Sequence, residues 1–352
     1  MSKRILLLLL LAALLPAPAQ EKKPYLSSPR RAFTAPELLN APDEWIERSL
    51  GWANDILDQF PPDLLERPVR RAALIRLDDV LHIESAPRNP LVQKFYRARM
   101  EKAVREIEAT RVNEGLRIWK LYNHGFLVRT PAVSFAFDIV PGLKGEGFAV
   151  DTGLLERLAE QADALFISHQ HGDHTSLPVI RLFLDRSKPV IAPEVEALRA
   201  AKVIFPKRSA TTVHEIPIQN GKRVLKVVAY PGHQGDLINN VHLVTTPDGF
   251  TVVHTGDQSG AEGPLSDFDW IAHIGRNHRV DVLLPNCWTT DIGRMARGVN
   301  PEVIITGHEN EMGHTVDHRE DYTQTYNHLF GVRYPFIVMG WGESYHYRAH
   351  SR

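Results

Sequence analysis

Cysteine is nearly absent from this 352-residue sequence, which contains only Cys287. A single cysteine cannot form an intramolecular disulfide, so other interactions must stabilise the fold. Cys287 follows the apolar run 280–285. We therefore interpret it as a small buried residue rather than as a metal ligand or a reactive thiol.

An excess of charge of one sign is also lacking. Lys and Arg total 41, Asp and Glu total 42, and the formal net charge is −1 at pH 7. This balance creates no strong field toward nucleic acid or an anionic membrane surface, so we expect no nucleic-acid partner. Hydrophobic residues make up 43% and charged residues 24%, which is typical of a folded globular protein.

Long apolar runs are confined to the N-terminal region. Residues 5–15 are apolar and follow Lys3 and Arg4, and this run is shorter than the ~20 residues that a membrane-spanning helix needs. The small residues 17–19 fit a cleavage site, which predicts a signal peptide over residues 1–19. We expect a periplasmic or secreted bacterial protein with no transmembrane span after cleavage; an uncleaved N-terminal anchor is the alternative.

Changes in composition divide the rest of the chain. Residues 20–42 are rich in Pro, Ser and charge and are interpreted as a linker or arm. Residues 43–113 carry apolar side chains at spacings of three and four, which predicts a helical extension. Its helices are expected from residue 43 to the prolines at 61–62, over 63–83 with a bend at Pro68, and over 90–112. We interpret this region as a packing extension, with a cap or dimer element as the alternative.

Residues 114–352 alternate short apolar strands with helical stretches, which predicts an α/β catalytic domain with helices outside its sheets. Helices are expected over 153–161, 177–185 and 194–201, and a closing strand over 341–346.

The most informative motif lies in segment 168–174, directly after the apolar stretch 164–167. Three imidazoles and a carboxylate fall within six residues there: His169, His171, Asp173 and His174. Imidazole is the commonest neutral nitrogen ligand for zinc, and carboxylates complete such sites. A loop at the end of a strand can fan these side chains around two neighbouring ions.

Three further candidate ligands follow later apolar runs. His233 comes after the run 227–230, Asp257 after 250–253, and His308 after 302–306. A glycine beside each one permits close backbone approach. Each residue alone is a weak indication, because a polar residue after a strand is more often a turn or cap residue.

Together, the motif and its downstream partners resemble the metallo-β-lactamase superfamily over residues 116–347. The resemblance implies a four-layer αβ/βα sandwich, here with an N-terminal helical extension, and a dinuclear metal site. It implies that His169, His171 and His233 hold one ion, that Asp173, His174 and His308 hold the other, and that Asp257 bridges them.

The resemblance also implies the chemistry. Two divalent ions share a water molecule and lower its pKa toward neutrality, while they polarise the bond under attack. Asp173 is assigned a second role in orienting this water. The ligand set favours zinc, with manganese or iron as alternatives. His171 argues against the diiron oxidoreductase branch, which carries Glu at this position.

The segment 116–128 and the strand 133–138 resemble the opening hairpin of the branch that contains ascorbate-6-phosphate lactonases and N-acyl-phosphatidylethanolamine-type phospholipases D. In that branch the equivalent of His124 lies beside the metals, so His124 is a candidate catalytic residue. Its alternative is a hairpin histidine bonded to backbone. The match is partial: Asn123 stands where Gly is usual, and Ile139 where Pro is usual.

We therefore expect a hydrolase that acts on an ester, lactone or phosphodiester in a small-molecule or lipid-like substrate, and a homo-oligomer is compatible with the sequence. The alternatives are a β-lactam or amide hydrolase, a metal-binding scaffold without turnover, and an iron-loaded oxidoreductase or sulfur-chemistry enzyme. Arg294, Arg297 and Arg319 are candidates for contacting a phosphodiester. His314 and His318 are a weaker candidate for an accessory metal pair.

Overall fold

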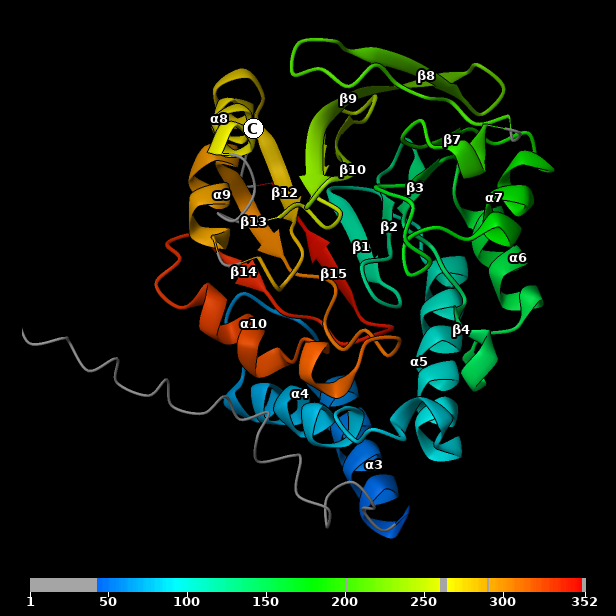
Figure 1. The fold of residues 1–352 in the computed structure, drawn as a ribbon, viewed down its shortest axis with the longest axis vertical. Coiled ribbons are helices and arrows are strands. Elements are labelled where there is room, and N and C mark those ends of the chain that lie inside the picture. Colours follow the sequence, from blue (N-terminus) through cyan, green and yellow to red (C-terminus); the bar gives the residue numbers. More distant parts are fainter. Residues whose placement is uncertain (1–42, 200–201, 260–264, 290, 350–352) are drawn as a thin grey trace, which may run out of the picture.

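The computed structural model describes residues 43–199, 202–259, 265–289 and 291–349, in which two β-sheets face each other with helices outside both (Figure 1). Helices α6 and α7 cover one sheet, and α8 and α9 cover the other. The predicted signal peptide and linker lie outside the described residues. This arrangement is the predicted four-layer α/β sandwich.

The first sheet has the strand order β15-β1-β2-β3-β6-β7. Its strands are β1 (Leu116–Lys120), β2 (Phe126–Arg129), β3 (Ser134–Phe137), β6 (Leu165–Phe166), β7 (Val190–Ile191) and β15 (Ser344–Tyr347). The second sheet has the order β14-β13-β12-β11-β10-β9-β8. Its strands are β8 (His214–Ile218), β9 (Arg223–Gln234), β10 (Leu237–Thr245), β11 (Thr251–His254), β12 (Val280–Leu284), β13 (Pro301–Ile305) and β14 (Phe336–Ile337). A short pair, β4 (Gly142–Leu143) and β5 (Phe148–Ala149), stands apart.

Apolar side chains from both sheets form the core between them, including Phe126, Phe137, Val252 and Ile305. The outer helices are α6 (Thr152–Gln161), α7 (Leu177–Leu184), α8 (Leu265–Asn277), α9 (Ile292–Val299) and α10 (Tyr322–Leu329). The Asp151 side chain begins α6 by accepting a hydrogen bond from the Leu154 backbone N–H at 2.8 Å. The expected helix over 194–201 is a single 3-10 turn, Glu196–Leu198, within the described residues.

The helical extension consists of α3 (Asp43–Gln59), α4 (Pro68–Leu81) and α5 (Pro90–Ala109). The prediction of a bend at Pro68 was wrong. Pro68 is the first residue of α4, where its missing N–H leaves no helical bond unmade. α5 ends three residues before the expected position, because Thr110 is extended.

Two buried carboxylates join the extension to the C-terminal part of the chain. Arg70 of α4 donates to both oxygens of Glu343, at 2.6 and 2.5 Å. Asp78 of α4 accepts hydrogen bonds from the backbone N–H groups of Tyr322 and Thr323 and from the Asn310 amide, at 2.9, 3.2 and 3.1 Å. The extension therefore holds the start of α10 and the loop before it in place. Figure 1 shows α4 and α10 side by side.

The C-terminal segment closes the first sheet. β15 pairs antiparallel with β1, and Trp341 is buried against Tyr96 and Tyr122. The Trp341 ring therefore packs between α5 and the turn that follows β1. Within the described ranges, no helix has the length and apolar character needed to cross a membrane.

Candidate metal centre

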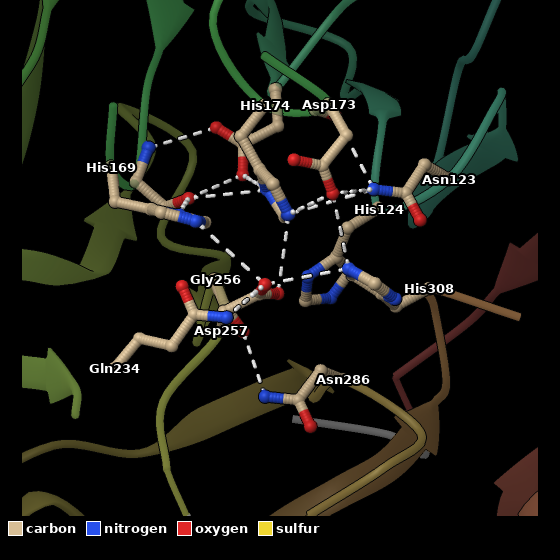
Figure 2. Close-up of polar contacts among 12 residues, drawn as sticks. Asn123, His124, His169, Asp173, His174, Gln234, Gly256, Asp257, Asn286 and His308 are labelled. Atoms are coloured by element: carbon tan, nitrogen blue, oxygen red, sulfur yellow. Dashed lines mark hydrogen bonds and ion pairs between the residues drawn. The ribbon is translucent and has the colours of Figure 1, made fainter. Parts of the chain in front are cut away.

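The candidate ligands come from loops at one edge of both sheets. The motif loop follows β6 in the first sheet, whereas Asp257 and His308 follow β11 and β13 in the second. β11, β12 and β13 are parallel neighbours, so their carboxyl ends point to the same edge. Figure 2 shows the side chains converging from these loops.

Four buried or nearly buried groups form what we call the second ion position: Asp173, His174, Asp257 and His308. The His174 Nε2 atom lies 3.2 Å from Asp173 Oδ2 and 3.2 Å from Asp257 Oδ1. The His308 Nε2 atom lies 3.3 Å from the same Asp173 oxygen and 3.4 Å from Asp257 Oδ2. Two nitrogens and two carboxylates around one point are a donor set for a divalent ion.

The first ion position is formed by His169, His171 and again Asp257. The His169 Nε2 atom lies 3.7 Å from Asp257 Oδ2, and the rings of His169 and His171 are 4.7 Å apart. Asp257 therefore belongs to both positions, as a bridging ligand must.

His233 is not part of either cluster. Strand β9 continues beyond its predicted end to Gln234, so His233 lies within the strand, opposite Ile238. The neighbouring Gln234 instead reaches the site, where its side-chain amide donates to Asp257 Oδ2 at 3.0 Å. The structure thus brings six of the seven predicted ligands together in these two clusters.

Backbone geometry places the ligands close to one another. Gly256 has a φ of +52°, and a Cβ there would lie 2.3 Å from Ser168, so only glycine fits beside the motif loop. His308 itself has a φ of +76°, which is strained for a residue with a side chain and typical of functional sites.

The charges of the site follow from burial and mutual contact. Burial lowers the pKa of His169 to about 3, so this imidazole is neutral and able to ligate. Burial favours the neutral imidazole and so lowers the pKa values of His174 and His308. The neighbouring Asp257 and Asp173 carboxylates outweigh burial and hold both pKa values well above normal. Protons on these two imidazoles thus balance the two carboxylates, and a bound cation would take over that role.

Buried atoms without hydrogen-bond partners indicate that the residues fit divalent ions. Within the described residues, His169 Nε2, His308 Nε2 and Asp257 Oδ1 are all inaccessible to solvent. Each lies near an oppositely charged group of the cluster, but none makes a hydrogen bond. Such atoms are costly unless something else satisfies them. Each belongs to one of the two clusters.

Two carboxylates behind the second position were not identified from the sequence. Asp138 Oδ2 lies 2.8 Å from His174 Nδ1, and its two oxygens also accept from the backbone N–H and hydroxyl of Ser168 at 2.8 and 2.6 Å. Glu320 Oε2 lies 3.5 Å from His308 Nδ1. Although burial opposes it, contact with His308 and His314 lowers the pKa of Glu320 to about 2. Carboxylates in this position orient a ligating histidine and raise its basicity.

His124 is fully buried beside the second position, and within the described residues neither of its ring nitrogens has a hydrogen-bond partner. Its ring centroid is 6.0 Å from that of His174 and 6.3 Å from that of His308. Figure 2 shows His124 beside these two ligands. Burial, followed by the neighbouring His254, lowers its pKa well below normal. The alternative of a hairpin histidine bonded to backbone through its ring does not hold here.

The remaining candidates lie elsewhere. Arg319 is buried and donates to the carbonyls of Leu81 and His314, so its role is structural. Arg294 and Arg297 line a surface cleft of about 660 Å³ that contains none of the cluster residues.

His314 and His318 do not lie on an α-helix. His318 ends the short 3-10 turn Val316–His318, and its side chain is exposed. They do not form a metal cluster among the described residues. Cys287 is buried, as predicted.

Comparisons with known proteins give the fold. No protein-family model matches the sequence, and no curated protein matches it. Among solved structures, a metallo hydrolase from Ignicoccus hospitalis, Igni18, has a TM-score of 0.51 and 18% identity, covering 67% of this chain and 99% of that one. The chain has the metallo-β-lactamase fold.

Two further solved structures are similar to this chain. An isothiocyanate hydrolase from Delia radicum gut bacteria has a TM-score of 0.49 and 12% identity, covering 66% of this chain and 100% of that one. CmlA, a diiron β-hydroxylase from Streptomyces venezuelae, has a TM-score of 0.46 and 14% identity, covering 68% of this chain and 55% of that one.

Proposed function

We propose that this chain is a dinuclear metal-dependent hydrolase, with zinc as its metal, acting on an ester, lactone or phosphodiester bond. The observation that carries this proposal is the pair of clusters that share Asp257, with ligand atoms left unpartnered in both. Two bound divalent ions would activate water at neutral pH and polarise the scissile bond.

The residues of the chain have distinct roles in this proposal. Asp257 spans both positions, and Asp173, on the more exposed side, would hold and orient the attacking water. His124 is neutral and unpartnered, so one ring nitrogen can donate a hydrogen bond and the other can accept one. We assign His124 to contact the reacting group and to move a proton there.

The same proposal includes location and partners. The apolar N-terminal segment supports a periplasmic or secreted location, and the near-zero net charge supports a small-molecule or lipid-like substrate rather than nucleic acid.

An oxidative function is the second candidate, although His171 stands where the diiron oxidoreductase branch carries Glu. Nitrogen-rich ligands suit iron as well as zinc. Such an enzyme would be coloured and loaded with iron as purified.

The first experiment measures metal content and hydrolysis by the purified protein. The substrates are bis-p-nitrophenyl phosphate, a lactone, a p-nitrophenyl ester and a chromogenic cephalosporin. We expect two equivalents of zinc and turnover that a chelator abolishes, with the cephalosporin the poorest substrate. Iron loading would support the oxidative function instead, and two zinc ions without any turnover would support a scaffold role.

Two variants sharpen this test. His124→Ala should reduce turnover while both ions stay bound, because His124 clusters with Asp138 and His174 but belongs to neither cluster that shares Asp257. The matched control is His273→Ala on α8, an exposed histidine whose loss should change neither quantity. Loss of zinc from His124→Ala would instead make this residue structural or a ligand.

A further inference from the structure

Asn123 lies in the turn between β1 and β2, with a φ of +53° and no exposed surface. Glycine adopts this left-handed conformation most readily, and asparagine is one of the few other residues that tolerate it. The backbone alone therefore does not require a side chain here, and the amide must be explained by what it contacts.

The amide contacts the second ion position. Asn123 Nδ2 donates to Asp173 Oδ2 at 3.0 Å and approaches the Asp173 backbone oxygen at 3.3 Å. This carboxylate oxygen is also the one that lies 3.2 Å from His174 Nε2 and 3.3 Å from His308 Nε2. The amide thus holds the oxygen that faces the other ligands (Figure 2).

Asp173 needs such support more than the other ligands do. It lies in the irregular loop after β6 and its side chain is 16% exposed, whereas those of His174 and His308 are at most 1% exposed. Within the described residues, Asn123 is the only group outside the cluster that donates a hydrogen bond to the Asp173 carboxylate. The Asn123 backbone carbonyl also accepts from the His308 backbone N–H at 3.1 Å, so one turn contacts two ligands.

We propose that the Asn123 amide is a positioning group for the second ion position, which keeps the Asp173 carboxylate oriented beside His174 and His308. This inference rests on the proposed dinuclear site. Hydrogen bonds to ligating groups typically change metal affinity by about 10–100-fold.

The substitution Asn123→Gly isolates the amide. Glycine keeps the positive φ and the backbone contact to His308, and it removes only the side chain. The matched control is Asn220→Gly, an exposed asparagine with a φ of +56° in the β8–β9 turn. Both variants replace an asparagine of the same backbone conformation.

The test is zinc titration by calorimetry on metal-free protein, in two backgrounds. His171→Ala removes a ligand of the first position only, and His308→Ala a ligand of the second. In the His171→Ala background, Asn123→Gly should weaken zinc binding about 10–100-fold, and Asn220→Gly should not change it. In the His308→Ala background, Asn123→Gly should have no effect, and the melting temperature of the metal-free protein should match that of the control.

Other outcomes overturn the inference in distinguishable ways. Unchanged zinc affinity in the His171→Ala background would make Asn123 a turn residue only. Equal weakening in both backgrounds with a lower melting temperature would show a general structural role. If the unsubstituted protein binds fewer than two ions, the proposed dinuclear function itself fails, and the inference fails with it.

Discussion

The two ion positions share Asp257 but are supported very differently. Both imidazoles of the second position are fully buried, and each has a carboxylate behind it, Asp138 or Glu320. At the first position, His171 is only half-buried. His169 Nδ1 there meets the Ser168 hydroxyl at 3.0 Å, a neutral partner.

This difference in support predicts different metal affinities at the two positions. Charged groups behind a ligand strengthen metal binding, and burial keeps the ligands in one geometry. We therefore expect the second position to bind its ion more tightly and to fill first. We expect substrate to approach the first position, because His171 there is only half-buried.

The largest effect is expected from removing the residue common to both positions. Asp257→Asn keeps the size of the side chain but removes a charge that both ions need. Zinc content should fall from two equivalents toward none, and turnover should fall by more than about 100-fold, the upper range for residues that merely support ligands. Metal analysis after dialysis and the substrate panel measure both. Asp236→Asn, in an exposed turn, is the control. Two retained ions would contradict the bridging role.

The next comparison removes one ligand from each position. His171→Ala should keep one tightly bound zinc, because the second position remains intact. His308→Ala should leave only the first position and bind zinc more weakly. Both variants should lose turnover, because the proposed mechanism needs both ions. Dialysis against increasing chelator concentrations compares zinc retention by the two variants. Tighter binding by His308→Ala than by His171→Ala would contradict the expected order of affinity.

The sequence predicted most members of the two clusters because they depend on local features. His169, His171, Asp173 and His174 lie on one loop directly after a strand, and their spacing alone brings them together. Asp257 and His308 follow parallel strands, which end at the same edge of a sheet. The four-layer arrangement was also predictable from the alternation of strands and helices, together with the family resemblance.

What the sequence did not reveal depends on contacts between distant segments. Asp138 was recognised as the end of a strand, but its contact with His174 is 36 residues away in the chain. Arg70 and Glu343 are separated by 273 positions, and no local pattern links them. The extended β9 was missed because Pro231 and Gly232 are ordinarily strand breakers, whereas here pairing with β10 carries the strand through them.

The carboxylates behind the second position should have intermediate effects. Asp138→Asn and Glu320→Gln should each weaken the second ion by about 10–100-fold without changing the first. Asp138 should have the larger effect, since it lies 2.8 Å from its histidine whereas Glu320 lies 3.5 Å away. Zinc titration in the His171→Ala background isolates the second position. Glu302→Gln, an exposed carboxylate on β13, is the control. Equal weakening of zinc binding at both positions would contradict the inference that these carboxylates support the second position only.

The smallest effect on metal binding is expected from Asp78, which acts at a distance. It holds Asn310 and the start of α10, and the segment between them carries Glu320. Asp78→Ala leaves buried donors unpaired, each costing about 1–3 kcal/mol of unfolding free energy. The second ion should weaken by less than in the Asp138 variant, because the loop remains attached through Arg319.

Denaturant unfolding of the metal-free protein and zinc titration separate these two effects of Asp78→Ala. Asp55→Ala, on the exposed face of α3, is the control and should change neither. A stability loss with no change at the second position would show that the extension supports the fold but not the metal centre. An effect on the first position alone would mean that the helical extension acts on the other half of the centre.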